Sequence, residues 1–194
     1  MEKLTNKFFN RDTLIVAREL LGKLLVRNID GNLITCRITE TEAYIGRSDK
    51  ACHAYGYKRT NRTETLFAKP GTAYVYLIYG MYHCLNFVTE PENEPAAVLI
   101  RSLQPISGLD KMIQFRFPGQ SGPLNAYQSK NFLNGPGKLC KALCIDRHLN
   151  GVDLTGDTLF VLSDGTSPDK VFSGPRIGID YAEEAKDFPW RFWI

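Results

Sequence analysis

Two glutamates near the end of a predicted strand are the side chains best suited to acid–base chemistry. Side chains alternate between the two faces of a strand, so the even-numbered residues of 33–44 should share one face. They are the apolar Ile34, Cys36 and Ile38, followed by Glu40, Glu42 and Tyr44. A buried, ionised carboxylate is costly unless it is paired or used. Either the strand leaves the core or contains a bulge that resets its parity, or a desolvated carboxylate acts as a base at a pocket rim. Arg101, which ends the apolar run 97–100, is the candidate charge partner.

Tyrosines gather in the next part of the chain, beside a basic run at residues 58–62. Seven of the nine tyrosines lie there: Tyr44, Tyr55, Tyr57, Tyr74, Tyr76, Tyr79 and Tyr82. Aromatic faces can stack on bases and cations can hold phosphates, which indicates nucleic acid. The alternative is that tyrosine simply suits strands and half-buried surfaces. The sequence Tyr-Gly-Met-Tyr, 79–82, falls at a predicted hairpin tip, where an exposed aromatic side chain could act as a wedge in a DNA stack.

Three other patterns carry weaker signals. Cys52-His53 and His83-Cys84 lack the usual spacing of zinc ligands. Residues 135–138, Gly-Pro-Gly-Lys, precede a predicted helix and either form an ordinary helix start or hold a phosphate on free N–H groups. No dinucleotide-binding or Walker motif occurs, so no nucleotide cofactor is expected. The sequence therefore predicts neither a metal nor a cofactor.

The elements that must position these residues form a mixed pattern. Helical spacing is found in residues 12–21, which Asp12 caps and Gly22 ends, and in 108–117 and 137–145. Strands are expected at 23–28, 33–44, 96–103, 158–162, 176–179 and 190–194, and a hairpin at 73–88. Strands scattered among helices with local hairpins favour an α+β fold with a largely antiparallel sheet.

Length and composition fit one globular domain over residues 1–194. Of the 194 residues, 43% are hydrophobic and 23% charged, and the net charge of +3 is only mildly basic. No run of about 18 apolar residues predicts a membrane span, and the N-terminus lacks the apolar region of a secretory signal. Five cysteines without a Cys-x-x-Cys pair indicate reduced, mostly buried thiols. An intracellular protein is expected.

Several sequence blocks, in one order, resemble the alkyladenine (3-methyladenine) DNA glycosylases of the mammalian and Bacillus type. The similarity runs from about Leu4 to the C-terminus. Its most specific blocks are 39–44 (TETEAY), 69–72 (KPGT) and 74–82 (YVYLIYGMY), and 99–101 (LIR), 135–140 (GPGKLC) and 175–178 (PRIG) extend it.

The resemblance implies a single-domain DNA repair enzyme with a curved, mainly antiparallel sheet, surrounding helices and a protruding hairpin that inserts into DNA. Such an enzyme flips a damaged purine out of the duplex, hydrolyses its N-glycosidic bond and leaves an abasic site. The lesions are of the 3-methyladenine, hypoxanthine and ethenoadenine class, and the sequence does not rank them. The expected partner is damaged double-stranded DNA, bound by a monomer in the bacterial cytoplasm or nucleoid, or in a eukaryotic nucleus.

The resemblance also assigns catalytic roles. Glu42 matches the general base that activates water, and Arg101 the arginine that holds the carboxylate and water. Val171 matches, less securely, a position whose backbone carbonyl places the water. No lysine occupies the position of the base, so a monofunctional enzyme without a Schiff-base intermediate is expected.

Further residues match the base pocket and the wedge. Tyr44, His53 and Tyr76 match the residues that stack against the flipped base. Asn86 matches the pocket-floor residue that discourages guanine, and Tyr79 the wedge that fills the vacated space in the DNA.

Two other classes remain open on the sequence. A catalytically silent protein of the same fold would bind damaged DNA without releasing a base, and the intact Glu42 and Arg101 speak against it. A metal-dependent nuclease would use Glu40, Glu42 and Asp49. The role of residues 117–134, which match the family poorly, is not assigned.

Overall fold

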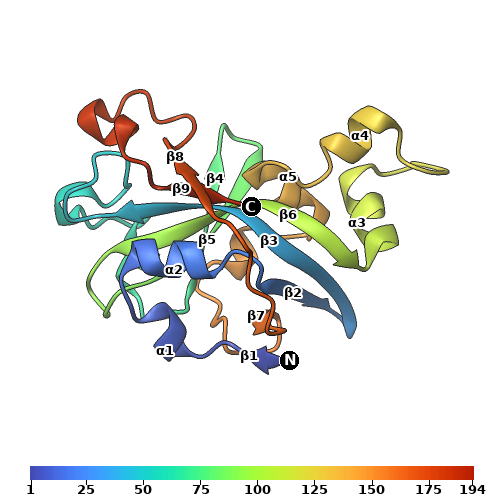
Figure 1. The fold of residues 1–194 in the computed structure, drawn as a ribbon, viewed down its shortest axis with the longest axis horizontal. Helices are drawn as coiled ribbons and strands as arrows, with labels where there is room; N and C mark the ends of the chain where they lie inside the picture. The colour runs from blue at the N-terminus through green and yellow to red at the C-terminus, as the bar shows by residue number, and fades with distance from the viewer.

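The computed structural model describes all residues 1–194. It contains one antiparallel sheet of nine strands (Figure 1). Seven strands follow one path: β1 (Glu2–Lys3), β7 (Leu159–Ser163), β2 (Leu24–Ile29), β3 (Asn32–Ile45), β6 (Ala96–Ser107), β5 (Tyr82–Val88) and β4 (Ala73–Ile78). The other two, β8 (Phe172–Gly174) and β9 (Arg191–Trp193), pair with each other, and β9 pairs with β3. The predicted α+β class with an antiparallel sheet is confirmed.

The long strand β3 is the axis of the sheet. It pairs with β6 along most of one edge. On its other edge it pairs with β2 up to Arg37 and with β9 from Glu40 to Glu42. The sheet therefore branches at residues 38–40, where β2 departs and β9 takes its place.

Five short helices surround the sheet. They are α1 (Asn6–Phe9), α2 (Thr13–Glu19), α3 (Leu109–Arg116), α4 (Ala126–Lys130) and α5 (Pro136–Ala142), with 3-10 turns at Tyr55–Tyr57, Glu64–Phe67, Arg147–Leu149 and Glu183–Asp187. The Asp12 side chain caps α2 by accepting from the Ile15 N–H, as predicted. In Figure 1, α3 and α4 lie at the end of the molecule away from α1 and α2. No helix is long and apolar enough to cross a membrane.

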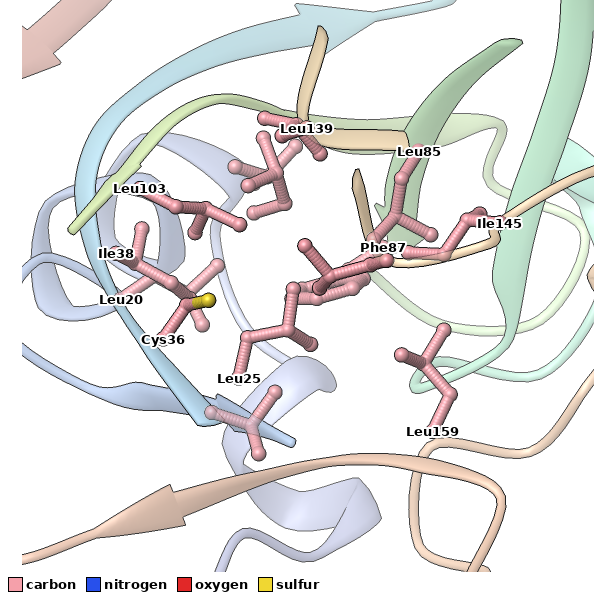
Figure 2. Packing of buried hydrophobic residues seen from close by; sticks show 14 of the residues in the cluster. Leu20, Leu25, Cys36, Ile38, Leu85, Phe87, Leu103, Leu139, Ile145 and Leu159 are labelled. Carbon is pink, nitrogen blue, oxygen red and sulfur yellow. The ribbon is translucent and has the colours of Figure 1, made fainter. Parts of the chain in front are cut away.

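The main core fills the space between β3, β5, β6 and the helices on one face of the sheet. Figure 2 shows Leu20, the residue after α2, beside Cys36 and Ile38 of β3, and Leu139 of α5 near Leu85 of β5. Four of the five cysteines are buried, as predicted, whereas Cys144 is exposed because it follows the end of α5 in a left-handed conformation (φ 50°).

The opposite face of β3, beyond the branch, is covered by irregular chain rather than by helices. Two small clusters of buried residues pack there, one formed by Cys52, Ala54, Leu66, Phe67, Tyr74, Val88 and Ala97, the other by Ala51, Ile179, Ala182 and Ala185. Tyr44 packs against both clusters. The strand predicted at 176–179 is wrong: β8 lies just before it, and 176–179 runs as irregular chain over this second layer.

Candidate active site

A double irregularity in the β3–β6 ladder explains where Glu42 points. Ile38 pairs with Leu103, Glu40 with Ser102 and Thr41 with Ile100, so Thr39 and Arg101 are left without ladder partners. A bulge of this kind shifts the alternation of side chains and re-aims one of them.

Beyond the bulge the core-facing parity changes to odd positions. Thr41 and Ala43 are fully buried on the main-core side, where the Thr41 hydroxyl donates to the carbonyl of Ala17 at 2.8 Å. The prediction that Glu42 shares the face of Ile38 is therefore wrong, and the parity-resetting bulge is present. Glu42 is nevertheless completely buried, because the second layer covers its face.

Two hydrogen-bond donors and one cation hold the Glu42 carboxylate. The Tyr44 hydroxyl donates to Oε2 at 2.7 Å, the Ile177 N–H donates to Oε1 at 2.9 Å, and Arg101 Nη1 lies 3.4 Å from Oε1. Burial raises the pKa of Glu42, and Arg101, Tyr44 and Ile177 each oppose that rise. Because Oε2 has a single protein partner, it keeps a lone pair for a further hydrogen bond.

Arg101 is itself fixed by a second carboxylate. Its Nε donates to Glu40 Oε1 at 3.2 Å, and Arg191 Nη1 donates to the same oxygen at 3.1 Å. Glu40 and Arg101 are mostly buried, with side chains 19% and 14% exposed. Glu40 thus orients the guanidinium toward Glu42, and the predicted Glu42–Arg101 contact is present.

A cavity of about 640 Å³ lies in front of this carboxylate. Its lining is mainly hydrophobic and includes six of the predicted site residues: Tyr44, His53, Tyr76, Tyr79, Asn86 and Arg101. Glu42 lies directly behind the wall that Tyr44, Arg101 and Ile177 form. The cavity can take a planar aromatic ligand, since such pockets combine apolar walls with a few placed polar groups.

Aromatic rings form one wall of the cavity. His53 meets Tyr76 edge to face with centroids 4.6 Å apart, and Tyr74 lies 5.2 Å from Tyr76. His53 Nδ1 and the Tyr74 hydroxyl are 3.1 Å apart. Burial, helped by the positive charge of Arg62, lowers the pKa of His53 to about 4, so its imidazole is neutral at neutral pH.

Asn86 lies deep in the cavity on β5. It is 4% exposed, and its Nδ2 donates to the Tyr74 carbonyl at 3.1 Å, which fixes the side-chain amide. Tyr74 was not predicted as a site residue, although it is held between His53 and Asn86. Its place in an alternating Tyr-x-Tyr strand, two residues before Tyr76, was the signal that could have identified it.

The hairpin of β4 and β5 carries aromatic side chains into solvent at the cavity mouth. Tyr79 is 80% exposed and Met81 68% exposed. Tyr79 and Gly80 both have positive φ (51° and 68°), the conformation of a tight hairpin turn. The fold does not use the Tyr79 ring, so it is free to contact a partner.

Of the predicted site residues only Glu42, which lies behind the cavity wall, and Val171 do not line this cavity. Val171 precedes β8 and lines a separate groove with Lys23 and Ser163. The structure therefore places Val171 apart from the other predicted site residues, because the chain enters the second layer only after β8. The backbone that reaches Glu42 belongs instead to Ile177, which sequence reasoning missed.

The alternative metal sites are not assembled. Glu40 and Glu42 share Arg101, whereas Asp49 is paired with Arg176. No three His, Cys, Asp or Glu side chains lie close enough together to hold one metal ion. The nuclease triad of Glu40, Glu42 and Asp49 is therefore contradicted by the geometry.

A buried carboxylate behind an aromatic cavity, beneath a hairpin with an exposed tyrosine, is the arrangement required of a protein that flips a base out of DNA. Comparison with known proteins agrees with that class. The family model described as methylpurine-DNA glycosylase matches residues 7–194, and the chain belongs to this family. The resemblance found in the sequence is thereby confirmed, as is its assignment as a DNA glycosylase.

Two bacterial relatives illustrate the similarity, both named "Putative 3-methyladenine DNA glycosylase". The protein of Clostridium perfringens (strain SM101 / Type A) is 54% identical over 195 residues, which cover 99% of this chain and 95% of the relative. The protein of Desulfitobacterium hafniense (strain Y51) is 52% identical over 194 residues, which cover 100% of this chain and 96% of the relative.

Proposed function

We propose that this protein is a monofunctional 3-methyladenine DNA glycosylase, which flips an alkylated or deaminated purine out of duplex DNA and hydrolyses its N-glycosidic bond. The observation that carries the proposal is the fully buried Glu42, held by Tyr44, Arg101 and Ile177 behind an aromatic cavity. Its DNA substrate and its bacterial relatives support an intracellular location.

The flipped purine enters the cavity and stacks between the Tyr44 side and the His53–Tyr76 wall. Electron-poor rings stack best on electron-rich aromatic faces, which favours alkylated, cationic purines. Asn86 is too well fixed by the Tyr74 carbonyl to swing away. Its amide therefore crowds the exocyclic amine of a normal guanine. Tyr79 fills the gap left in the duplex, since its ring is exposed on the hairpin tip.

Hydrolysis uses the free lone pair of Glu42 Oε2. A water bound there gives its proton to the carboxylate while its oxygen attacks the anomeric carbon of the sugar, and the purine leaves with the electron pair of the N-glycosidic bond. The sugar becomes positive in the transition state, and the nearby carboxylate stabilises that charge. Arg101 favours the ionised form of Glu42, because its positive charge opposes the pKa rise that burial causes.

The state of Lys138 supports a hydrolytic rather than a lyase reaction. Lys138 is the one lysine that lines the cavity, and its Nζ donates to Oδ1 of Asn131 and Oδ1 of Asn134, both at 2.9 Å. An ammonium held in this way is not available to attack the sugar.

The proposal is tested by incubating duplex DNA that contains one hypoxanthine, or methylated adenine, with the protein in EDTA and then adding alkali. We expect free base and a strand break that appears only after alkali. Strand cleavage without alkali, or a covalent adduct trapped by borohydride, would contradict the monofunctional mechanism. Tight binding to both lesions without release of a base would identify a silent DNA-binding protein instead.

A further inference from the structure

Arg176 and Asp49 form a completely buried ion pair beside the site. Both side chains are 0% exposed. The guanidinium donates to both carboxylate oxygens, with Nη2 2.7 Å from Oδ1. The backbone N–H of Ala51 also donates to Asp49, at 2.9 Å. Neither residue touches the cavity or belongs to the chemistry proposed above.

The same guanidinium holds two backbone segments. Nη1 donates to the carbonyl of Ala43 at 2.8 Å, and Nη2 donates to the carbonyl of Ala185 at 3.0 Å. It also lies over the rings of Tyr44 and Trp190, 4.6 and 5.1 Å from their centroids. Ala43 lies between Glu42 and Tyr44 in the sequence. Arg176 therefore binds the backbone of β3 between the two residues whose side chains form the site.

The next residue after Arg176 provides a donor to Glu42. The Ile177 N–H donates to Glu42 Oε1 at 2.9 Å, in a segment that has no strand or helix partner. The Arg176 side chain joins this irregular segment to β3 next to that bond, and Arg191, which pairs with Glu42 in the β3–β9 ladder, donates to the Pro175 carbonyl two residues earlier. A rotation or displacement of the segment would move the Ile177 N–H away from the carboxylate.

Stability alone does not explain such a pair. Replacing a buried ion pair by apolar side chains is often neutral or stabilising, because desolvation offsets much of the attraction. The Nε of Arg176 is buried without a hydrogen-bond partner, which adds a further cost. The planar guanidinium does what an apolar side chain cannot: through its hydrogen bonds it fixes the positions of Asp49 and Ala43 relative to the segment that follows Arg176.

We propose that Arg176, anchored by Asp49, is a positioning residue that keeps the Ile177 amide on Glu42 and the Tyr44 ring in place. It acts through these groups and does not contact the substrate. The inference rests on the proposed role of Glu42 as the base.

The test compares Arg176→Lys with wild type in single-turnover base release from one damaged duplex between pH 5 and 9. Lysine keeps the charge but cannot join Asp49, Ala43 and Ala185 at once. We expect base release at the acidic end to fall about tenfold, the loss of roughly one hydrogen bond to a charged group. The rate should recover at alkaline pH, and affinity for damaged DNA should change less than threefold. Arg37→Lys, which disturbs an Arg–Asp pair remote from the site, is the matched control and should keep the wild-type profile.

The pH profile separates positioning from simple destabilisation. Groups facing Glu42 are Arg101 and Leu99 on β6, Glu40 and Tyr44 on β3, Arg191 on β9, Cys84 on β5, and the Ile177 amide. Of these groups, only the Ile177 amide and Tyr44 are held in place by Arg176. A destabilised but correctly positioned site would not lose activity selectively at the acidic end, because ionising the buried Glu42 lowers stability as pH rises.

The possible outcomes separate a positioning role of Arg176 from a purely structural one. A variant that loses activity equally at all pH values, or a control that shifts as much as the variant, would overturn the positioning role. Should Arg176→Lys fail to fold, Asp49→Asn is measured, because it keeps the arginine, and the same shift is expected. An unfolded Asp49→Asn would mean that the pair holds the fold rather than the site. Wild-type rates in Glu42→Gln would instead refute the proposed role of Glu42 as the base, whereas no base release by the wild type would refute the proposed function.

Discussion

Replacing Tyr44 by phenylalanine isolates the hydrogen bond that the tyrosine donates to the proposed base. The change removes one hydroxyl that lies 2.7 Å from Glu42 Oε2 and keeps the ring that faces the cavity. Glu42 is completely buried, so the loss of this donor leaves its charge less well stabilised. The variant should therefore hold a less stabilised carboxylate in an otherwise intact pocket.

The size of the effect follows from the contacts. A hydrogen bond to a charged group contributes about 1.5–3 kcal/mol, and about 1.4 kcal/mol corresponds to one pH unit. Arg101 and Ile177 remain on the other oxygen, which favours the low end of that range. The Tyr44 bond lowers the pKa of Glu42, so its loss raises that pKa. We expect the acidic limb of the rate profile to move upward by about one pH unit.

The assay is single-turnover base release from one damaged duplex, expressed as the ratio of variant to wild-type rate at each pH. Protonation of the leaving purine is common to both proteins and cancels in this ratio. The ratio should be about one at alkaline pH. It should fall to roughly one tenth at pH values more acidic than the acidic limb of the wild-type profile. Tyr181→Phe, which removes another hydroxyl from the same cavity, is the control and should give no step. A ratio independent of pH would refute the assignment of Glu42 as the titrating base.

Three further predictions concern the exposed ring of Tyr79, the buried charge of Glu42 and the packing of Gly137 against Tyr82. Tyr79→Ser should weaken binding to damaged duplex roughly tenfold or more, the loss of one base stack, without lowering the Tm, because the ring is 80% exposed; an unchanged affinity in a binding titration would show that Tyr79 is not a wedge. Burial raises the pKa of Glu42, so ionising it costs stability as pH rises from its unfolded value through the raised folded one. Glu42→Gln should therefore melt at a higher temperature than wild type at pH 7, with a gap that closes toward about pH 4; a gap independent of pH in thermal melts would contradict this. Gly137→Ala should destabilise by about 1–3 kcal/mol in urea unfolding, because its Cβ would lie 2.9 Å from the Cβ and ring of Tyr82; a gain in stability would mean that helix propensity outweighs the clash.

The regular elements followed from local patterns. Alternation gave β2, β3 and the β4–β5 hairpin, and the Asp12 cap and Gly22 gave the limits of α2, because these signals lie within a few residues of sequence. The carboxylate and the arginine were also recognisable as candidates. Each was out of place in an apolar strand, and the structure joins them across adjacent strands.

The direction in which Glu42 points was not predictable from alternation. The unpaired Thr39 and Arg101 shift the register on two strands, and such a shift depends on the pairing of residues about 60 positions apart. The parity argument therefore identified a buried carboxylate but placed it on the wrong face.

The second layer was the other part that the sequence did not reveal. Residues 46–72 and 175–190 pack through small clusters without regular periodicity, so neither the burial of Arg176 nor the contact of Ile177 with Glu42 had a local signal. Val171 was matched from the family resemblance, whereas the backbone that contacts Glu42 in the structure is that of Ile177. Which residue of an irregular segment reaches a site depends on where the chain crosses it, and spacing does not specify that point.

The most direct test of the central claim is release of methylated adenine from duplex DNA by wild type and Glu42→Gln, in EDTA and under single-turnover conditions. Glutamine keeps the size of the side chain and an oxygen for the Ile177 N–H, but it cannot take a proton from water. We predict rapid release by the wild type and a rate lower by orders of magnitude in the variant, with affinity for the damaged duplex retained. Release by Glu42→Gln within a few fold of the wild-type rate would contradict the role of this carboxylate as the base.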